Sequence, residues 1–260
     1  MPIILTPDEI INTVLHSNLK ESGVTTVFME DKLYRDKKGI EPYRFMQKQI
    51  GQNKVSFFSC QGKGNLMKVY ERRAELKGIP ILFLRDRDMY VYQSIPNEYS
   101  DLIFTTGYSI ENDVYAYTSI EDLLDRQEKS MYEKAKHNFL LWYSSQIHLL
   151  LKGTETIYDF SPHHILNIDL SINEKYVPCE SILHESKPLF NDIKENYFIK
   201  LRGHSLFALL ILFIDAPKRS PRINYEKLLH YSINELSSPL LMKLILEIEE
   251  RHNKIWNMSI

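Results

Sequence analysis

The hydrophobic positions at the start of the chain follow a helical period. Thr6 and Glu9 have the spacing of a capping box, and Pro7 stands at the first position that a helix would occupy. The apolar residues that follow recur at helical spacing; they are Ile10, Ile11, Val14, Leu15 and Leu19. This pattern predicts an amphipathic helix that ends by Gly23.

Four short apolar runs predict buried strands. They cover residues 24–29, 55–58, 81–84 and 102–105, and helical patterns lie between them at 41–50 and from Asn65 to Leu76. Strands that alternate with helices are typical of βαβ units and a parallel sheet. Because the runs are continuously apolar, both faces of the sheet should be covered. The expected fold class is α/β, with a Rossmann-type, mostly parallel sheet flanked by helices.

The pattern changes near residue 120, where helical spacing becomes dominant. Helices are expected at 120–151, 188–197, 204–214, 225–236 and 239–251. We therefore expect an α/β domain over residues 1–118 and a helical domain over 119–260. The helical part could pack directly on the sheet, and it offers surfaces for dimerisation or for contact with a partner or RNA.

Composition and charge exclude several classes of protein. Of 260 residues, 43% are hydrophobic and 25% charged, which is ordinary for a globular protein and argues against long disorder. The net charge of −2 excludes a protein that coats nucleic acid through overall basicity. Two distant cysteines match no metal-binding spacing and favour a reducing compartment. No signal-peptide pattern or membrane-length apolar run occurs, so a cytoplasmic protein is expected.

Acidic residues follow two of the predicted strands. Glu30 ends the first strand, and Asp86 and Asp88 follow the third. Ligands bind beyond the carboxyl ends of open parallel sheets, and on an extended backbone residues i and i+2 point to the same side. Converging carboxylates suit Mg²⁺, which takes oxygen ligands. Acids after strands are also common in solvated turns, so the pattern alone leaves both interpretations open.

The same residues resemble the TOPRIM domain of type IA topoisomerases, primases and OLD-type nucleases. The likeness extends over three further stretches, Gln61–Asn65, Phe83–Asp88 and Thr105–Asn112, and over Leu201–His204 before an apolar helix. Together they resemble the AriB-like family of bacterial effectors, the nuclease subunits of PARIS anti-phage systems. The resemblance implies a toxic endonuclease that is released by an ABC-type ATPase partner resembling AriA. Once released, the nuclease would dimerise and cleave host tRNA.

The resemblance also implies roles for individual residues. Glu30 would be the catalytic acid or base, Asp86 and Asp88 would ligate Mg²⁺ or Mn²⁺, and Glu111 is a candidate fourth acid. Arg202 and His204 are candidates for nucleic-acid contact. One departure concerns Glu30: the family glutamate is usually followed by glycine, whereas Asp31 stands here.

Basic residues offer further candidate contacts. Lys63 lies between two glycines at a predicted strand-to-helix turn. A helix N-terminus with a lysine can bind phosphate, but the segment can also be a plain tight turn. The full P-loop pattern is absent, so an ATPase would be a separate chain. Two basic groups could meet phosphates or form solvated faces; they are Lys32, Arg35, Lys37, Lys38, Arg44 and Lys48, and Lys218, Arg219 and Arg222.

Two other functions stay open at this point. A nuclease of the OLD type would cut DNA, and nothing in the sequence decides between the two substrates. Alternatively, the chain could be a binding or regulatory module that keeps the fold without catalysis. The atypical Asp31 is the observation that suggests this hypothesis. The histidines, among them His163, His164, His184 and His204, lack the spacing of a helical zinc motif.

Overall fold

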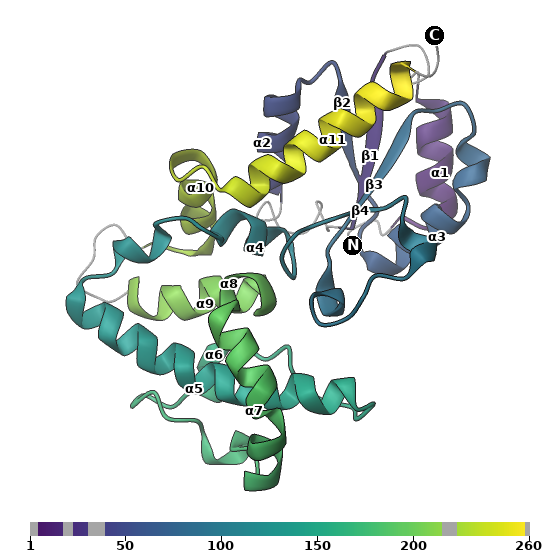
Figure 1. Cartoon of the computed structure of the whole chain (residues 1–260). Helices are drawn as coiled ribbons and strands as arrows, with labels where there is room; N and C mark the ends of the chain where they lie inside the picture. Colours follow the sequence, from purple (N-terminus) through teal and green to yellow (C-terminus); the bar gives the residue numbers. More distant parts are fainter. Residues whose placement is uncertain (1–4, 18–22, 31–39, 215–222, 258–260) are drawn as a thin grey trace. The chain divides into compact units, whose positions relative to one another are not determined.

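The chain folds into two compact units that are described separately. The structure is a computed structural model, and it describes residues 5–17, 23–30, 40–214 and 223–257. One unit comprises Met1–Thr106 with Ser237–Ile260, and the other comprises Gly107–Leu236 (Figure 1).

The first unit contains the predicted parallel sheet. Its strands are β1 (Thr25–Met29), β2 (Val55–Ser59), β3 (Ile81–Arg85) and the short β4 (Ile103–Phe104). They are ordered β2-β1-β3-β4, and all neighbouring pairs are parallel. Every residue of β1 is buried, as the continuous apolar runs predicted. The α/β fold class is confirmed.

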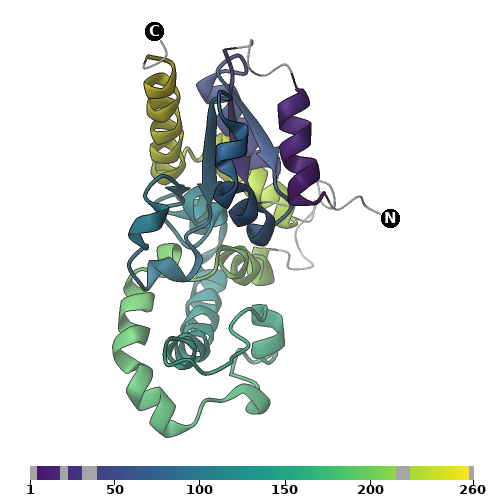
Figure 2. The same ribbon diagram turned by 90° about the vertical axis from the view of Figure 1, so that its right-hand side faces the viewer.

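Helices cover both faces of this sheet. On one face, α1 (Pro7–His16) and α3 (Lys63–Glu71) share a core with the stacked rings of Phe28 and Phe83, whose centroids are 5.1 Å apart. On the other face, α11 (Pro239–Asn257) contacts β3 and also α2 (Ile40–Ile50), which packs against β2. Figure 2 shows α1 and α11 on opposite sides of the sheet.

The start of α1 confirms the capping prediction. Thr6 caps the helix, Glu9 completes the capping box, and Pro7 stands at the first turn. The helix ends at His16, before the expected Gly23, which instead turns into β1 with φ of +70°.

The helix expected from Asn65 to Leu76 has different bounds. It begins at Lys63 and stops at Glu71, and a 3₁₀ helix, η3 (Arg73–Leu76), follows. Asn65 does not cap it. Its side-chain Nδ2 donates to the Leu5 carbonyl oxygen at 3.1 Å, so Asn65 ties the segment before α1 to α3. Two more 3₁₀ helices, η4 (Asp88–Val91) and η5 (Asn97–Tyr99), precede β4.

The last helix belongs to the unit that contains the sheet. The Thr25 hydroxyl lies 2.8 Å from His252 Nδ1 and accepts from Trp256 Nε1 at 3.2 Å. Lys54 forms an ion pair of 2.7 Å with Glu249. The division of the chain therefore differs from the expected boundary at 118/119, because α11 supplies the apolar cover for one face of the sheet.

The second unit is helical, as its sequence pattern predicts. Its longest helix, α5 (Arg126–Leu151), packs against α7 (Glu180–Glu195) and α9 (Gly203–Ile214). The remaining elements are α4 (Ile110–Tyr115), η6 (Ile120–Leu123), α6 (Pro162–Ile165), η7 (Glu174–Tyr176), α8 (Tyr197–Lys200) and α10 (Tyr225–Glu235).

Two helix boundaries in this unit correct the sequence-based expectation. The single helix expected over 120–151 is divided, because Asp125 and Glu128 form a capping box that starts α5 anew after η6. The helix expected from residue 188 begins at Glu180, so Pro188 lies inside α7 rather than at its start. Across the described part of the chain, no helix is long and apolar enough to cross a membrane.

Candidate functional site

The strand order creates a topological switch point at the carboxyl edge of the sheet. From β1 the chain continues to β2 on one side, whereas β3 lies on the other side of β1. Such a switch between neighbouring strands opens the crevice in which ligands of open α/β sheets bind. Glu30 is the first residue beyond β1, and Asp86 is the first beyond β3. The two acids thus flank the switch point.

The register shows how close the two strand ends are. Met29 pairs with Leu84, so Glu30 follows at the level of Arg85, one residue before Asp86. Neighbouring strands lie about 4.8 Å apart. The fold thus brings the two acids to the same edge of the sheet, with an offset of one residue between them.

Glu30 is half-buried and lies near the end of β2 as well. Its Oε2 atom is inaccessible to solvent. Burial, together with the negative charge of Glu30, raises the pKa of the Cys60 thiol to about 12. The Cys60 amide donates to the Met29 carbonyl oxygen at 2.7 Å. Cys60 is therefore a buried thiol of the core beside the acid.

The extended backbone expected over Asp86–Asp88 is not present. Arg87 has φ of −69° and ψ of −30°, and Asp88 has φ of +49° and begins η4. The chain leaves the strand direction directly after Asp86. Asp88 instead forms an ion pair with Lys63 at the start of α3, with Oδ2 and Nζ 2.6 Å apart.

The acids do not form a closed metal cage. Within the residues that the structure describes, no group of three or more His, Cys, Asp or Glu side chains could hold a metal ion. Mg²⁺ commonly uses only one or two carboxylates and completes its shell with waters and substrate phosphates. Glu30 and Asp86 follow adjacent strand ends, and their carboxylates are the kind of oxygen ligand that such an open, hydrated site uses.

Glu111 belongs to the second unit. It lies on α4, and its Oε1 accepts a hydrogen bond of 3.0 Å from the Tyr225 hydroxyl. That contact joins α4 to α10, so Glu111 has a structural partner of its own.

Two arginines next to the acids were missed by the sequence reasoning. Arg85 is 4% exposed, and its guanidinium lies between 5.3 and 5.8 Å from the rings of Tyr90, Tyr99 and Phe104. Its Nε is buried and makes no hydrogen bond to a described residue. Cation–π attraction offsets part of the cost of burying this charge. The alternation of arginine and aspartate over 85–88 was the available signal.

Arg87 lines a polar pocket of about 220 Å³ beyond β4. Its amide donates to Thr105 Oγ1 at 3.0 Å, and its Nη1 donates to the Thr106 carbonyl oxygen at 3.1 Å. Lys243 of α11 lines the same pocket, and the lining carboxylate, Glu247, pairs with Arg251 at 2.8 Å. The pocket is thus cationic and large enough for a phosphate group.

The motif residues of the second unit form a packed junction. The Asn112 amide donates to the carbonyl oxygens of Leu201 at 2.7 Å and Phe198 at 2.9 Å. Gly203 lies so close to this segment that a Cβ would be 2.4 Å from Ser109 Oγ. The two motifs that are distant in sequence therefore meet in space, and their contacts join α4 to the start of α9.

The residues predicted to contact nucleic acid, two in the second unit and one in the first, each have local partners. Arg202 Nη1 donates to the Asp159 carbonyl oxygen at 2.8 Å. His204 is exposed, with its ring centroid 5.5 Å from that of Tyr225. Lys63 is held by Asp88, as described above. These residues keep exposed surface, and their role in binding nucleic acid stays a prediction.

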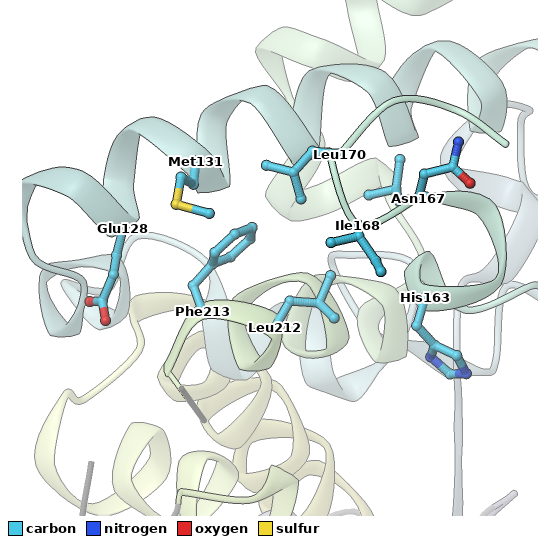
Figure 3. A pocket seen from close by; sticks show the side chains of 9 residues that line it. Glu128, Met131, His163, Asn167, Ile168, Leu170, Leu212 and Phe213 are labelled. Carbon is cyan, nitrogen blue, oxygen red and sulfur yellow. The ribbon is translucent and has the colours of Figure 1, made fainter. Parts of the chain in front are cut away.

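The second unit also has an apolar pocket of about 430 Å³, shown in Figure 3. Met131 of α5, Leu212 and Phe213 of α9, and Ile168 and Leu170 of the loop after α6 line it. His163 stands at its margin with its ring 4.0 Å from that of His164. None of the candidate acids lines this pocket.

Some predicted contacts lie outside the described residues. These are the atypical Asp31 with Lys32, Arg35, Lys37 and Lys38, and the second basic group, Lys218, Arg219 and Arg222. Arg44 and Lys48 are described and lie exposed on α2.

Comparisons with known proteins add no identification. A scan against protein-family models, a search of curated proteins and a search of solved structures each found no match to this chain.

Proposed function

We propose that the chain is a Mg²⁺-dependent endonuclease of the TOPRIM type, with its active site at the carboxyl ends of β1 and β3. One observation carries the proposal: Glu30 and Asp86 follow two adjacent parallel strands at the switch point of the sheet. Ligand sites of open α/β sheets lie at this position, and carboxylates are the side chains that a hard cation needs there.

In the proposed phosphodiester hydrolysis, the residues at the sheet edge have different roles. Asp86, with Glu30 beside it, would hold the cation, which when bound supplies charge stabilisation to the phosphate. Glu30 is the group that moves a proton, since a half-buried carboxylate can act as general acid or base. The ion pair of Lys63 with Asp88 fixes the turn after β3. Arg87 and Lys243 would bind a neighbouring phosphate in their pocket.

The proposed substrate is tRNA, and the proposed setting is anti-phage defence. Both rest on the resemblance of residues 61–65, 83–88, 105–112 and 201–204 to the AriB-like effectors. In that setting an ABC-type ATPase would restrain the chain, and a homodimer would be the active form.

The nuclease proposal is tested with purified protein on tRNA and on plasmid DNA, each with Mg²⁺, with Mn²⁺ and with EDTA. We expect cleavage of tRNA that EDTA abolishes. Glu30→Gln and Asp86→Asn should each lower the rate at least about 100-fold, the usual contribution of a positioned acid–base group. Asp101→Asn is the matched control, because Asp101 is an exposed acid of the same unit, with 73% of its side chain accessible.

The outcomes separate the candidate activities. Cleavage of plasmid but not tRNA would favour a DNA nuclease of the OLD type. If neither nucleic acid is cut under any condition, or if Glu30→Gln cuts as fast as the wild type, the nuclease proposal is wrong.

A non-catalytic binding module is the second candidate. The engagement of Asp88 by Lys63 favours it, because this pair removes one predicted ligand from the cation site. Calorimetric titration with Mg²⁺ distinguishes a metal site from an inert turn: binding that Asp86→Asn abolishes supports a site, whereas no binding supports the module.

A further inference from the structure

Glu121 in the second unit is surrounded by tyrosines. Its Oε1 accepts hydrogen bonds from the hydroxyls of Tyr115 at 2.6 Å, Tyr132 at 2.9 Å and Tyr197 at 2.6 Å. Burial is the larger cause that raises the pKa of each of these phenols above its usual value, and nearby negative charges, Glu121 among them, raise it further. The hydroxyls thus stay protonated donors, and they hold this carboxylate in a fixed place.

The same aromatic cluster already holds one ammonium group of the chain. Lys136 Nζ lies 4.1 Å from the centroid of the Tyr197 ring and 4.8 Å from that of Tyr132. It pairs with Glu133 at 2.7 Å and is 4.0 Å from Glu121 Oε2. Aromatic faces combined with carboxylates are the standard way in which proteins bind organic cations.

A cavity of about 310 Å³ opens beside this cluster. This volume lies at the lower end of the range for small-molecule sites. Four aromatic rings and two carboxylates line it, and none of its lining residues is cationic; the rings and acids are Tyr115, Tyr117, Tyr197, Phe198, Glu121 and Asp122. The cavity therefore offers the chemistry that binds Lys136. Its second acid, Asp122, forms an exposed ion pair with Lys129, whose Nζ lies 2.7 Å from Asp122 Oδ1.

Tyr117 marks the mouth of this cavity. It is 65% exposed, although large aromatic side chains are commonly buried. Its φ of +59° is unfavourable for a bulky residue. Its ring contacts Phe198 edge-on, with centroids 4.8 Å apart. The chain thus holds an exposed aromatic face in a strained conformation next to two carboxylates, an arrangement that contributes little to the core.

We infer that this cavity is a binding site for an organic cation, an alkylammonium or guanidinium group that inserts between Tyr117, Phe198 and Tyr197 and takes the place of the exposed Lys129 at Asp122. The group could come from a free polyamine or from a lysine or arginine side chain of another protein. The inference is independent of the proposed nuclease activity, because it uses no residue of the sheet edge.

Calorimetric titration of the full chain tests the site. The probes are spermidine, a short peptide with one lysine and one arginine, and an uncharged alkanol of similar length. The buffer contains EDTA and about 0.15 M salt, which screens nonspecific charge attraction. We expect saturable binding of spermidine or of the peptide, and none of the alkanol. Spermidine alone would indicate a free amine, and the peptide alone would indicate a partner's side chain.

Variants show whether the bound cation occupies this cavity. Tyr117→Ala and Asp122→Asn should each weaken binding at least tenfold, and both change exposed side chains, so the thermal unfolding of each variant should match the wild type. Tyr231→Ala is the control, because Tyr231 is an exposed tyrosine of α10 outside the cavity. The inference is wrong if neither cation binds, if the alkanol binds equally well, or if Tyr117→Ala binds like the wild type.

Discussion

Gly203 shows how much a missing side chain can matter in the second unit. A Cβ at this position would lie 2.7 Å from Glu111 Cβ and 2.8 Å from Asn112 Oδ1, besides the close approach to Ser109. All three neighbours are side-chain atoms, and Glu111 Cβ is bonded directly to the backbone of α4, so it cannot move aside without moving the helix. The start of α9 therefore requires glycine for reasons of space.

Gly203→Ala should lower the free energy of unfolding by about 1–3 kcal/mol, the usual cost of overpacking. Gly64→Ala is the matched control, because a Cβ there meets nothing within 4 Å. Since alanine is about 1 kcal/mol better than glycine inside a helix, the control should be neutral or stabilising. Urea unfolding followed by circular dichroism measures both variants, and equal midpoints for the two would contradict the close packing.

The acids at the sheet edge show where prediction from sequence succeeds and where it stops. Apolar runs locate strand ends, so Glu30 and Asp86 could be assigned to the carboxyl edge without a structure. The direction of Asp88 could not, because one residue with φ of +49° turns the chain and its side chain pairs with Lys63 of another element. Contacts between residues 25 positions apart leave no periodic signal.

Helix α1 is held in position by its buried face and by the capping of its first turn. Ile10, Ile11 and Val14 are buried in the core beside the sheet. At its start the Glu9 amide donates to Thr6 Oγ1 at 3.3 Å, and the Thr6 amide donates to Glu9 Oε2 at 2.7 Å. A helix of 10 residues is too short to be stable alone, so packing and capping act together.

Thr6→Ala should destabilise the protein by about 1 kcal/mol, because it leaves an amide of the first turn without its acceptor. Asn12→Ala on the exposed face of the same helix is the control, and it should be neutral or slightly stabilising since alanine has the highest helix propensity. Thermal unfolding of the two variants in parallel measures the difference. A larger loss for Asn12→Ala than for Thr6→Ala would refute this role of the cap.

Local signals of this kind explain which elements could be predicted. The capping box and the apolar spacing predict the type and the start of α1. Continuous apolar runs predict the three long strands in the same local way. Pro188 was misleading because proline favours a first turn, whereas here α7 continues through it and buries Ser186, Phe190 and Ile193. Tertiary packing therefore overrides the local preference in α7.

The first unit is discontinuous in sequence. Its sheet is complete by Phe104, yet α11 begins at Pro239 and places Leu244, Ile245 and Ile248 in buried positions. Sequence patterns predicted the helix but assigned it to the helical domain, because periodicity identifies an apolar face without identifying what covers it.

Ile248→Ala should cost about 2–5 kcal/mol, since Ile248 is fully buried and truncation leaves a cavity. Leu246→Ala on the same helix should change the free energy of unfolding by less than about 0.5 kcal/mol, because Leu246 is 55% exposed. Chemical unfolding in a Trp142→Phe background, followed by the fluorescence of Trp256, whose indole donates to Thr25, reports on the contact with β1. Similar losses in the two variants would contradict the assignment of α11 to this unit.

The contact between Thr25 and His252 also sets an order of events during synthesis. The two residues are 227 positions apart, so a ribosome releases β1 long before it releases the helix that covers it. Residues 107–236, being contiguous, can fold in that interval, whereas one face of the sheet lacks the cover of α11 in the nascent chain. The edge that carries Glu30 and Asp86 thus reaches its final form only when translation has passed α11.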